Sequence, residues 1–208
     1  TKGGAEAATV VDRILLHSRG PDAEHKNVLL SVDITNCFNT LDRAEVLSAL
    51  YDKPQFATAF RFADWAYNSP SDLLMVGRNG KLLGKITSQQ GVKQGDPLGS
   101  LLSAIALHPA YLATQARFPD VKVVAIQDDC NLIGTAQQVL HAADFVTKEL
   151  RKLGATTNPA KTKILWPHDE EAPLRLQAWA RHHSLHVLTA ANINGTVIGR
   201  RDEVPDMA

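Results

Sequence analysis

The sequence predicts an α+β fold in which helices pack on a central antiparallel sheet. Short apolar runs rich in Val and Ile indicate strands, longer stretches with apolar residues at helical spacing indicate helices, and Asn-Gly pairs between apolar runs indicate hairpins. These signals are interspersed along 208 residues, of which 44% are hydrophobic. That length and composition suit one sizeable globular domain, or one domain with part of a neighbour.

Composition narrows the possible partners and compartments. Lys and Arg number 22, as do Asp and Glu, so the formal net charge is zero and nucleic-acid binding would need a local basic patch. Cys37 and Cys130 form no disulfide framework and indicate a reducing compartment. No apolar run approaches the roughly 18 residues of a membrane helix, so no membrane partner is expected. The chain begins TKGGAEAATV, without an initiator Met or a signal peptide, as a piece of a longer protein would.

The first third of the chain predicts three helices and one buried strand. The strand is VLLSVD, Val28 to Asp33, and it ends in a carboxylate. Asp42 and Glu45 form a capping-box signal for a helix that continues through Leu50. The other two helices are indicated by apolar residues at helical spacing: Ala7, Val10, Val11, Ile14 and Leu15 on one face before the strand, and Phe56, Phe60, Ala63 and Tyr67 between Pro54 and Pro70.

The middle of the chain predicts a hairpin, a loop and a long helix. Residues 73–76 and 82–87 flank Asn79-Gly80, which is a strong hairpin signal. The glycine-rich stretch SQQGVKQGDPLGS that follows would let main chain approach a substrate closely. Pro97 suits the first position of the next helix, and Pro109 should kink or break that helix.

The stretch 121–134, VKVVAIQDDCNLIG, predicts a hairpin with two carboxylates at its turn. Asp128 and Asp129 repel each other unless a cation compensates them, so a divalent metal ion is one interpretation. An exposed turn is the other, because Asp is a common turn residue. The pair does not by itself decide between them.

The last third begins with a helix that Gly154 ends. Its apolar stripe is formed by Val139, Ala143, Val146, Leu150 and Leu153. A run of basic residues follows that stripe and is either a solvated helix face or a charged binding surface: Lys148, Arg151, Lys152, Lys161 and Lys163. Residues 164–166 could form a strand, 169–185 are weakly helical, and 187–188 with 196–198 flank Asn194-Gly195, a final hairpin signal.

Acidic residues thus end two of the predicted strands. If both strands lie in one sheet, Asp33 and the pair Asp128-Asp129 converge. Mg²⁺ takes oxygen ligands and shares them with substrate phosphates. Two such ions, roughly 3.5–4 Å apart, stabilise the attacking and leaving oxygens of an in-line displacement.

Four ordered motifs resemble those of the reverse transcriptase palm: DITNCFNTLDR (33–43), QGVKQGDPLGSLLS (90–103), AIQDD (125–129) and GATTNPAKTK (154–163). NGTVIG (194–199) resembles the primer-grip segment, and the opening GGAEAATVVDRIL resembles the lead-in helix of non-LTR retrotransposon enzymes of the site-specific, trypanosomatid-like group. The resemblance covers nearly the whole chain. It implies one palm domain over 1–208, with a lead-in helix and fingers–palm connection at 1–27, a palm core at 28–166 and a primer-grip region at 167–208.

The resemblance also implies roles for individual residues. Asp33 and Asp128 match the two metal-binding aspartates, and Asp129 matches a third acid that engages metal less directly. Lys161 matches a lysine near the nucleotide phosphates that could stabilise, or donate a proton to, the pyrophosphate leaving group. Without the resemblance, Lys161 reads as one more surface lysine.

Three further residues would contact the incoming nucleotide. Phe38 stands five residues after Asp33, where the family keeps an aromatic gate against the 2′-hydroxyl of ribonucleotides; a core aromatic is the alternative. Gln94 and Gly95 match the loop that packs beside the nucleotide. Catalysis would then be attack of a primer 3′-hydroxyl on the α-phosphate of a dNTP, with release of pyrophosphate and with two Mg²⁺ or Mn²⁺ ions. The resemblance implies an RNA template, a DNA primer, and a location inside the cell, in its nucleus.

The sequence also departs from the family pattern. Ile126 stands where an aromatic is usual before the acid pair, and Gln127 where small or apolar residues are commoner. Basic fingers strands should precede residue 1, and a thumb should follow residue 208. A non-catalytic relative that serves as a structural or RNA-binding part of a larger assembly is therefore the alternative. A viral RNA-dependent RNA polymerase shares the acids, but QGDPLGSLL and Phe38 count against it.

Overall fold

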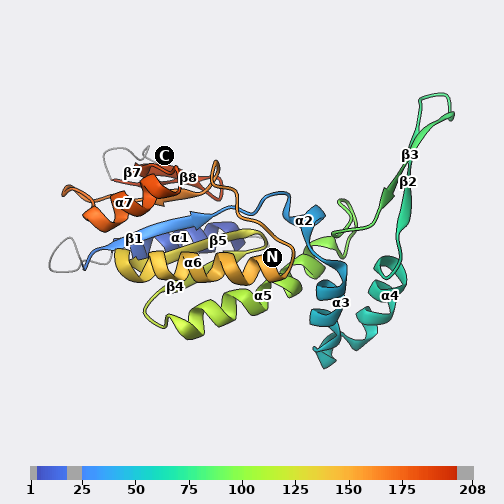
Figure 1. The fold of residues 1–208 in the computed structure, drawn as a ribbon, viewed down its shortest axis with the longest axis horizontal. Helices are drawn as coiled ribbons and strands as arrows, with labels where there is room; N and C mark the ends of the chain where they lie inside the picture. Colours follow the sequence, from blue (N-terminus) through green and yellow to red (C-terminus); the bar gives the residue numbers. More distant parts are fainter. Residues whose placement is uncertain (1–3, 18–24, 201–208) are drawn as a thin grey trace.

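A computed structural model describes residues 4–17 and 25–200 and contains a five-stranded sheet with helices on both faces (Figure 1). The strand order is β4-β5-β1-β6-β7, and all neighbouring pairs are antiparallel except β6 with β7. The strands are β1 (Asn27–Val32), β4 (Lys122–Ile126), β5 (Asp129–Thr135), β6 (Lys163–Leu165) and β7 (Val187–Leu188). The predicted α+β class with a mainly antiparallel central sheet is confirmed.

Side chains of the central strands alternate between two different environments, as the pleat of a strand requires. Val28, Leu30 and Val32 of β1 point into the larger core, which also holds Cys130 and Leu132 of β5. The intervening positions point to the other face, where Leu29, Ile133 and Leu165 join a smaller core. Each face therefore carries its own set of buried residues. Whether a strand residue stands at an odd or an even position, its parity, determines which of the two cores it contacts.

Two long helices cover the face with the larger core. They are α5 (Gly99–Arg117) and α6 (Ala136–Lys152), and both contact the sheet and each other. Pro109 lies inside α5, so the predicted break does not occur. Pro109 is exposed, whereas Leu102, Ala106 and Ala110 on either side of it are buried, so packing holds the helix together across the missing hydrogen bond. Pro97 precedes rather than begins the helix.

The opposite face is covered by α1 (Gly4–Leu16). This helix forms where it was predicted, but its apolar stripe of Val10, Val11 and Ile14 is exposed. The side that meets the sheet carries Ala8, Thr9, Asp12 and Leu16, all buried. Asn131 of β5 donates to Asp12 with Nδ2 2.7 Å from Oδ2, while Oδ1 of each residue is buried without a partner. A polar contact therefore orients this helix.

Because Asp12 is buried, the free energy of unfolding should depend on pH. Desolvation raises its pKa from 3.8 to about 6, although the Asn131 hydrogen bond acts in the opposite direction. Between about pH 4 and pH 6, Asp12 is therefore protonated in the folded state and ionised in the unfolded state. The free energy of unfolding consequently falls as pH rises through this range. The total contribution is about 3 kcal/mol.

We expect Asp12→Asn to be more stable than the parent chain at pH 8 and to lose this part of the pH dependence. The amide removes the buried charge and brings an N–H donor for the unpartnered Oδ1 of Asn131. Urea unfolding at pH 5 and pH 8 measures the difference, with the exposed Asp144 changed to Asn as control. Equal slopes against pH for the parent and Asp12→Asn would show that this carboxyl stays ionised in the fold.

The segment between β1 and α5 holds short helices and a projecting hairpin. Helices α2 (Cys37–Thr40), α3 (Arg43–Tyr51) and α4 (Ala57–Tyr67), with a 3-10 turn at Pro54–Phe56, lead into strands β2 (Ser71–Val76) and β3 (Leu82–Ser88). Asp42 caps α3 as predicted, accepting a hydrogen bond from Ala44 N at 2.7 Å. The β2–β3 hairpin extends away from the body of the domain (Figure 1), and its apolar side chains are exposed along both strands.

The C-terminal part adds a helix and a second hairpin. Helix α7 (Leu174–His182) lies within the segment predicted to be weakly helical. The final hairpin is confirmed at Asn194-Gly195, but its strands are β8 (Ala190–Ile193) and β9 (Thr196–Gly199). Val187-Leu188 was the wrong first strand, because these residues pair with β6 in the central sheet instead.

No helix among the described residues combines the length and apolar character needed to cross a bilayer. Residues 1–3, 18–24 and 201–208, which fall in the lead-in and primer-grip segments, lie outside the described ranges.

Candidate active site

A small pocket lies on the face of the sheet that α1 covers, where β1 ends and β5 begins. The β1–β5 register pairs Val32 with Cys130, so the next residues along, Asp33 and Asp129, come side by side. Both have the parity of the α1 face, as does Lys163 at the start of β6. We call this cavity of about 230 Å³ the acid pocket; its lining residues are Ser31, Asp33, Asp129, Ala160, Lys161, Lys163, Asn192, Ile193 and Asn194.

The loop between α6 and β6 is joined to the main chain around Asp33. Asn158 N donates to Asp33 O at 2.8 Å, and Thr35 N donates to Thr156 O at 2.8 Å. Asp33 N in turn donates to Thr162 Oγ1 at 3.4 Å. These contacts fix the loop beside the first acid, and they explain why Lys161, which this loop carries, reaches the pocket although it lies 128 positions after Asp33 in the chain.

The carboxylates act on one another electrostatically. Burial raises the pKa of Asp129, the charges of Asp128 and Asp33 raise it further, and Lys163 lowers it. The buried Cys37 thiol is affected by the same charges: its pKa rises to about 12 through burial and then through Asp128 and Asp33. The charges of Asp33 and Asp128 thus both act on Asp129, and Lys163 compensates them in part.

The donor set suits a hard divalent cation, because carboxylate oxygens are the ligands that Mg²⁺ prefers. The repulsion that raises the pKa of Asp129 is also what a bound cation would relieve. Among the described residues, however, no three His, Cys, Asp or Glu side chains form a cluster that could hold a metal ion. Asp128 occupies the β4–β5 turn beside Gln127, whose φ of 55° is left-handed, and does not line the acid pocket. The structure therefore brings Asp33, Asp129 and Lys161 into one pocket, whose lining does not include Asp128.

The three predicted nucleotide-contacting residues lie in a neighbouring region. Phe38 is half-buried in α2 and packs against the larger core, and its carbonyl accepts a hydrogen bond from Val92 N at 2.6 Å. Gln94 and Gly95 follow two and three residues after Val92 and are exposed. The glycine-rich loop (residues 89–98) is thus joined to the helix that carries Phe38, but none of the three lines the acid pocket.

Two residues that were not predicted as functional hold this loop in place. Arg43 is buried, and its guanidinium donates to Gly91 O at 2.8 Å and to Ser88 Oγ at 2.7 Å. Tyr67 is also buried; its hydroxyl donates to the Asp96 carboxylate and accepts from Lys93 N at 3.2 Å. The sequence contained Arg43 within the first motif, but nothing in its spacing indicated that its partners would be carbonyls of the loop.

Sequence reasoning also did not assign several other residues that line the acid pocket to the site, among them Ser31, Lys163 and Asn192. Ser31 could have been found from strand parity, since it lies two residues before Asp33 on the predicted strand. Lys163 could not, because Lys161 lies in a turn before β6 and only the β1–β6 register brings Lys163 to the pocket. Asn192 could not, because the strand that carries it was not predicted.

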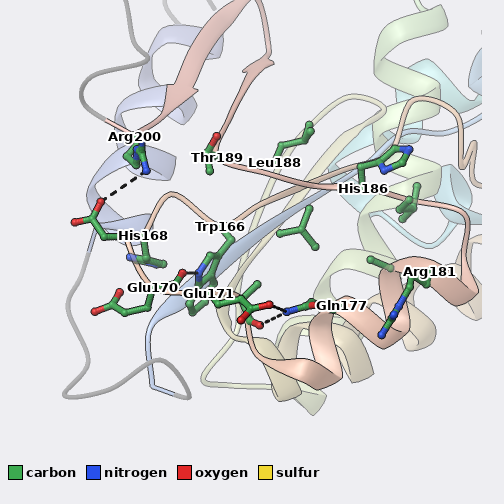
Figure 2. Close-up of a pocket in the computed structure, with 15 residues that line it drawn as sticks. Trp166, His168, Glu170, Glu171, Gln177, Arg181, His186, Leu188, Thr189 and Arg200 are labelled. Carbon is green, nitrogen blue, oxygen red and sulfur yellow. Dashed lines mark hydrogen bonds and ion pairs between the residues drawn. The ribbon is translucent and has the colours of Figure 1, made fainter.

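A larger pocket of about 600 Å³ lies between α7, β7 and the segment after β6, with Trp166 at its centre and Arg181 and Arg200 at its two ends (Figure 2). Two of its acidic groups have partners: Glu171 accepts from Gln177, and Asp169 pairs with Arg200 at 3.8 Å. His186 lines this pocket, whereas His182 and His183 line a different one, so the three histidines do not form one metal site.

A mainly antiparallel sheet that brings acids from two strands together, with a glycine-rich loop in the neighbouring region, is the arrangement of a polymerase palm. The chain belongs to the reverse transcriptase (RNA-dependent DNA polymerase) family, whose model matches residues 9–189. It is 26% identical, over 144 residues, to the retrotransposable element SLACS 132 kDa protein of Trypanosoma brucei gambiense. The match covers 69% of this chain and 12% of that protein.

Solved structures with the same fold include telomerases of two yeasts. The telomerase of Candida albicans, determined with a fragment of telomeric RNA, gives a TM-score of 0.63 at 14% identity over 97% of this chain and 33% of that chain. The apo telomerase of Candida tropicalis without its C-terminal domain gives 0.63 at 15% identity over 96% and 38%. At these identities the likeness shows the fold alone, which is the palm fold that the sequence predicted.

Proposed function

We propose that this chain is the palm of a retrotransposon RNA-directed DNA polymerase that transfers a deoxynucleotide from a dNTP to a primer 3′-hydroxyl. The observation that carries the proposal is the acid pocket, where Asp33 and Asp129 come from separate strands beside Lys161. RNA template, DNA primer and dNTP are the proposed substrates. Because the chain spans 12% of the retrotransposon protein and about a third of the telomerase chains, we further propose that polymerisation also uses segments of the fingers and thumb type.

Asp33, Asp128 and Asp129 are the residues that would hold two Mg²⁺ or Mn²⁺ ions. Bound there, the ions would lower the cost of charge on the attacking hydroxyl and on the leaving pyrophosphate. Lys161 would stabilise that leaving group, or donate a proton to it, from the rim of the acid pocket. The glycine-rich loop would bring Gln94 and Gly95 against the nucleotide, held from behind by Arg43 and Tyr67.

Primer extension on an RNA template, with Mg²⁺ or Mn²⁺ and with the chain in its complete native reading frame, tests the function. Metal binding can be measured separately: Mn²⁺ should raise the melting temperature of the 208-residue chain and should not raise that of Asp33→Asn. Metal binding without extension would favour the alternative of a non-catalytic relative, and the absence of both would reject the two-metal site.

Phe38 is proposed to exclude ribonucleotides, so Phe38→Val should weaken discrimination against the 2′-hydroxyl. The ratio of kcat/KM for dNTP over rNTP should fall at least about tenfold, which corresponds to roughly 1.4 kcal/mol of differential transition-state binding. Deoxynucleotide use should survive in part, because the acid pocket does not include this ring. An unchanged ratio would mean that Phe38 is a core residue, and an equal loss with both substrates would mean that it supports the site without selecting the sugar.

A further inference from the structure

Two cationic side chains contact the same cross-strand residue pair of the β8–β9 hairpin, one from each edge of the hairpin. We call this residue pair the rung. Asn192 and Val197 face each other in the hairpin register. Lys163 Nζ donates to Asn192 O at 2.6 Å, and Arg13 Nη2 donates to Val197 O at 2.7 Å. The two cations come from elements far apart in the chain, β6 and α1, yet their acceptors belong to one cross-strand pair.

The rung lies close to the part of the hairpin that reaches the acid pocket. Ile193 and Asn194, which follow Asn192, both line that pocket with Asp33 and Asp129. Ile193 and Ile198 are buried in the smaller core with Leu29 and Leu165, so the hairpin also rests on the sheet. A shift of the rung would therefore move the hairpin tip relative to the acids.

A two-stranded hairpin needs such outside contacts, because it is marginally stable by itself in water. Its buried apolar side chains fix its height above the sheet, but apolar contact is non-directional. Hydrogen bonds from charged donors to main-chain carbonyls are directional and stronger than neutral ones. Contacts at both edges therefore set where the hairpin lies along the sheet.

We propose that Arg13 and Lys163 are positioning residues that jointly clamp the β8–β9 hairpin and thereby align the primer terminus with the acid pocket. The role assigned to the primer rests on the proposed function, whereas the clamp itself does not. Lys163 also faces Asp129, so its removal changes the charge of the pocket as well. Arg13 does not line the acid pocket, so its removal tests the clamp without that change.

Amide hydrogen exchange of the 208-residue chain tests the clamp without any assay of activity. In Arg13→Met and in Lys163→Met, the amides of 190–199 should exchange at least about tenfold faster, while those of β1, β5 and α6 keep the parent rate. Because either loss frees the same rung, the double variant should exchange little faster than the faster single variant. Lys163→Arg and Arg13→Lys retain a cationic donor and should restore most of the protection.

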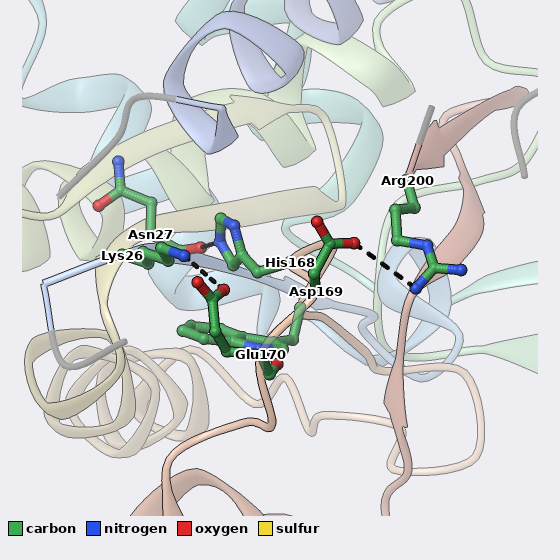
Figure 3. Close-up of polar contacts among 7 residues, drawn as sticks. Lys26, Asn27, His168, Asp169, Glu170 and Arg200 are labelled. Carbon is green, nitrogen blue, oxygen red and sulfur yellow. Dashed lines mark hydrogen bonds and ion pairs between the residues drawn. The ribbon is translucent and has the colours of Figure 1, made fainter. Parts of the chain in front are cut away.

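The hairpin base offers a matched control. Asp169 pairs with Arg200, directly after β9, at 3.8 Å (Figure 3). Asp169 is 94% exposed, and an ion pair as exposed as this contributes little. Asp169→Asn should therefore leave exchange of 190–199 unchanged. If it opens the hairpin as far as Arg13→Met does, or if Arg13→Met and Lys163→Met change nothing, the clamp is wrong.

The link to catalysis is tested by primer extension with the chain in its complete native reading frame. Arg13→Met should raise the KM for primer about tenfold with a smaller change in kcat, and Arg13→Lys should reverse the increase. Faster exchange with an unchanged primer KM would keep the clamp and reject its role in primer alignment. If the parent shows no extension, the proposed function fails while the exchange result still stands. Should Arg13→Met not fold, Arg13→Gln with the same two measurements replaces it.

Discussion

Asp33→Asn should lower kcat for primer extension by at least about a thousandfold, which is roughly 4 kcal/mol of transition-state stabilisation. Asn keeps the shape of the side chain but removes the charge that would hold a metal ion at the attacking oxygen. The variant should fold at least as well as the parent, because Asp33 contributes to the repulsion that raises the pKa of Asp129. Lost activity with an equal or higher melting temperature is therefore the expected combination.

The other two acids should not respond equally. Asp128→Asn should lower kcat about as much as Asp33→Asn. Neither carboxylate forms an ion pair within the described ranges, so each keeps its charge for a metal ion. Asp129→Asn should cost less, since Lys163 already compensates Asp129 in part. Asp144→Asn, the same change on the exposed side of α6, is the control and should leave kcat unchanged. If Asp129→Asn proves the more damaging of the pair, the residue lining the acid pocket is the main ligand and the assignment of Asp128 is reversed.

The sequence could predict the acids because the signal is local. An apolar strand ending in Asp33 and a hairpin with Asp128 and Asp129 at its tip are each visible in a short stretch of sequence. Their convergence needed one further assumption, that both strands share a sheet, and β1 and β5 are indeed neighbours. The order of the four motifs supplied that assumption through the family resemblance rather than through spacing.

The orientation of α1 could not be predicted, because the usual rule selects the wrong side. Val10, Val11 and Ile14 form the more apolar stripe, yet Asp12 and Thr9 face the sheet. The helix is oriented by the side-chain hydrogen bond between Asp12 and Asn131 on β5, 119 residues away in sequence. A polar contact between such distant residues leaves no trace in the periodicity of either segment.

The pocket residues that were missed depend on register rather than on type. Lys163 reaches the acids because β6 pairs with β1 so that Ser31 faces Lys163. A shift of one residue would move Lys163 to the face covered by α6. The loop contacts of Arg43 are harder still, since a helix-start arginine is normally solvated, and only the fold brings the carbonyls of Ser88 and Gly91 to it.

Gly91→Ala should lower the free energy of unfolding by about 2–5 kcal/mol. Gly91 has a φ of +69°, and a Cβ there would come 2.3 Å from Phe38 O and 2.5 Å from Asn39 Cα, both main-chain atoms that cannot rotate away. The strained dihedral costs roughly 1–2 kcal/mol, and forcing the loop off α2 costs a further 1–3 kcal/mol. The displaced loop would also stretch the Val92 N–Phe38 O and Arg43–Gly91 hydrogen bonds. Urea unfolding at constant pH measures the loss.

Gly95→Ala separates the two parts of that cost. Gly95 lies in the same loop with a φ of +86°, but nothing stands within 4 Å of the position its Cβ would take. It should therefore lose only the dihedral part, about 1–2 kcal/mol. The difference between the variants isolates the contact between the loop and α2, the contact that keeps Phe38 and Gln94 in one region. If both variants lose the same amount, the loop does not pack on α2 as described, and the nucleotide-side arrangement proposed for Phe38, Gln94 and Gly95 loses its physical basis.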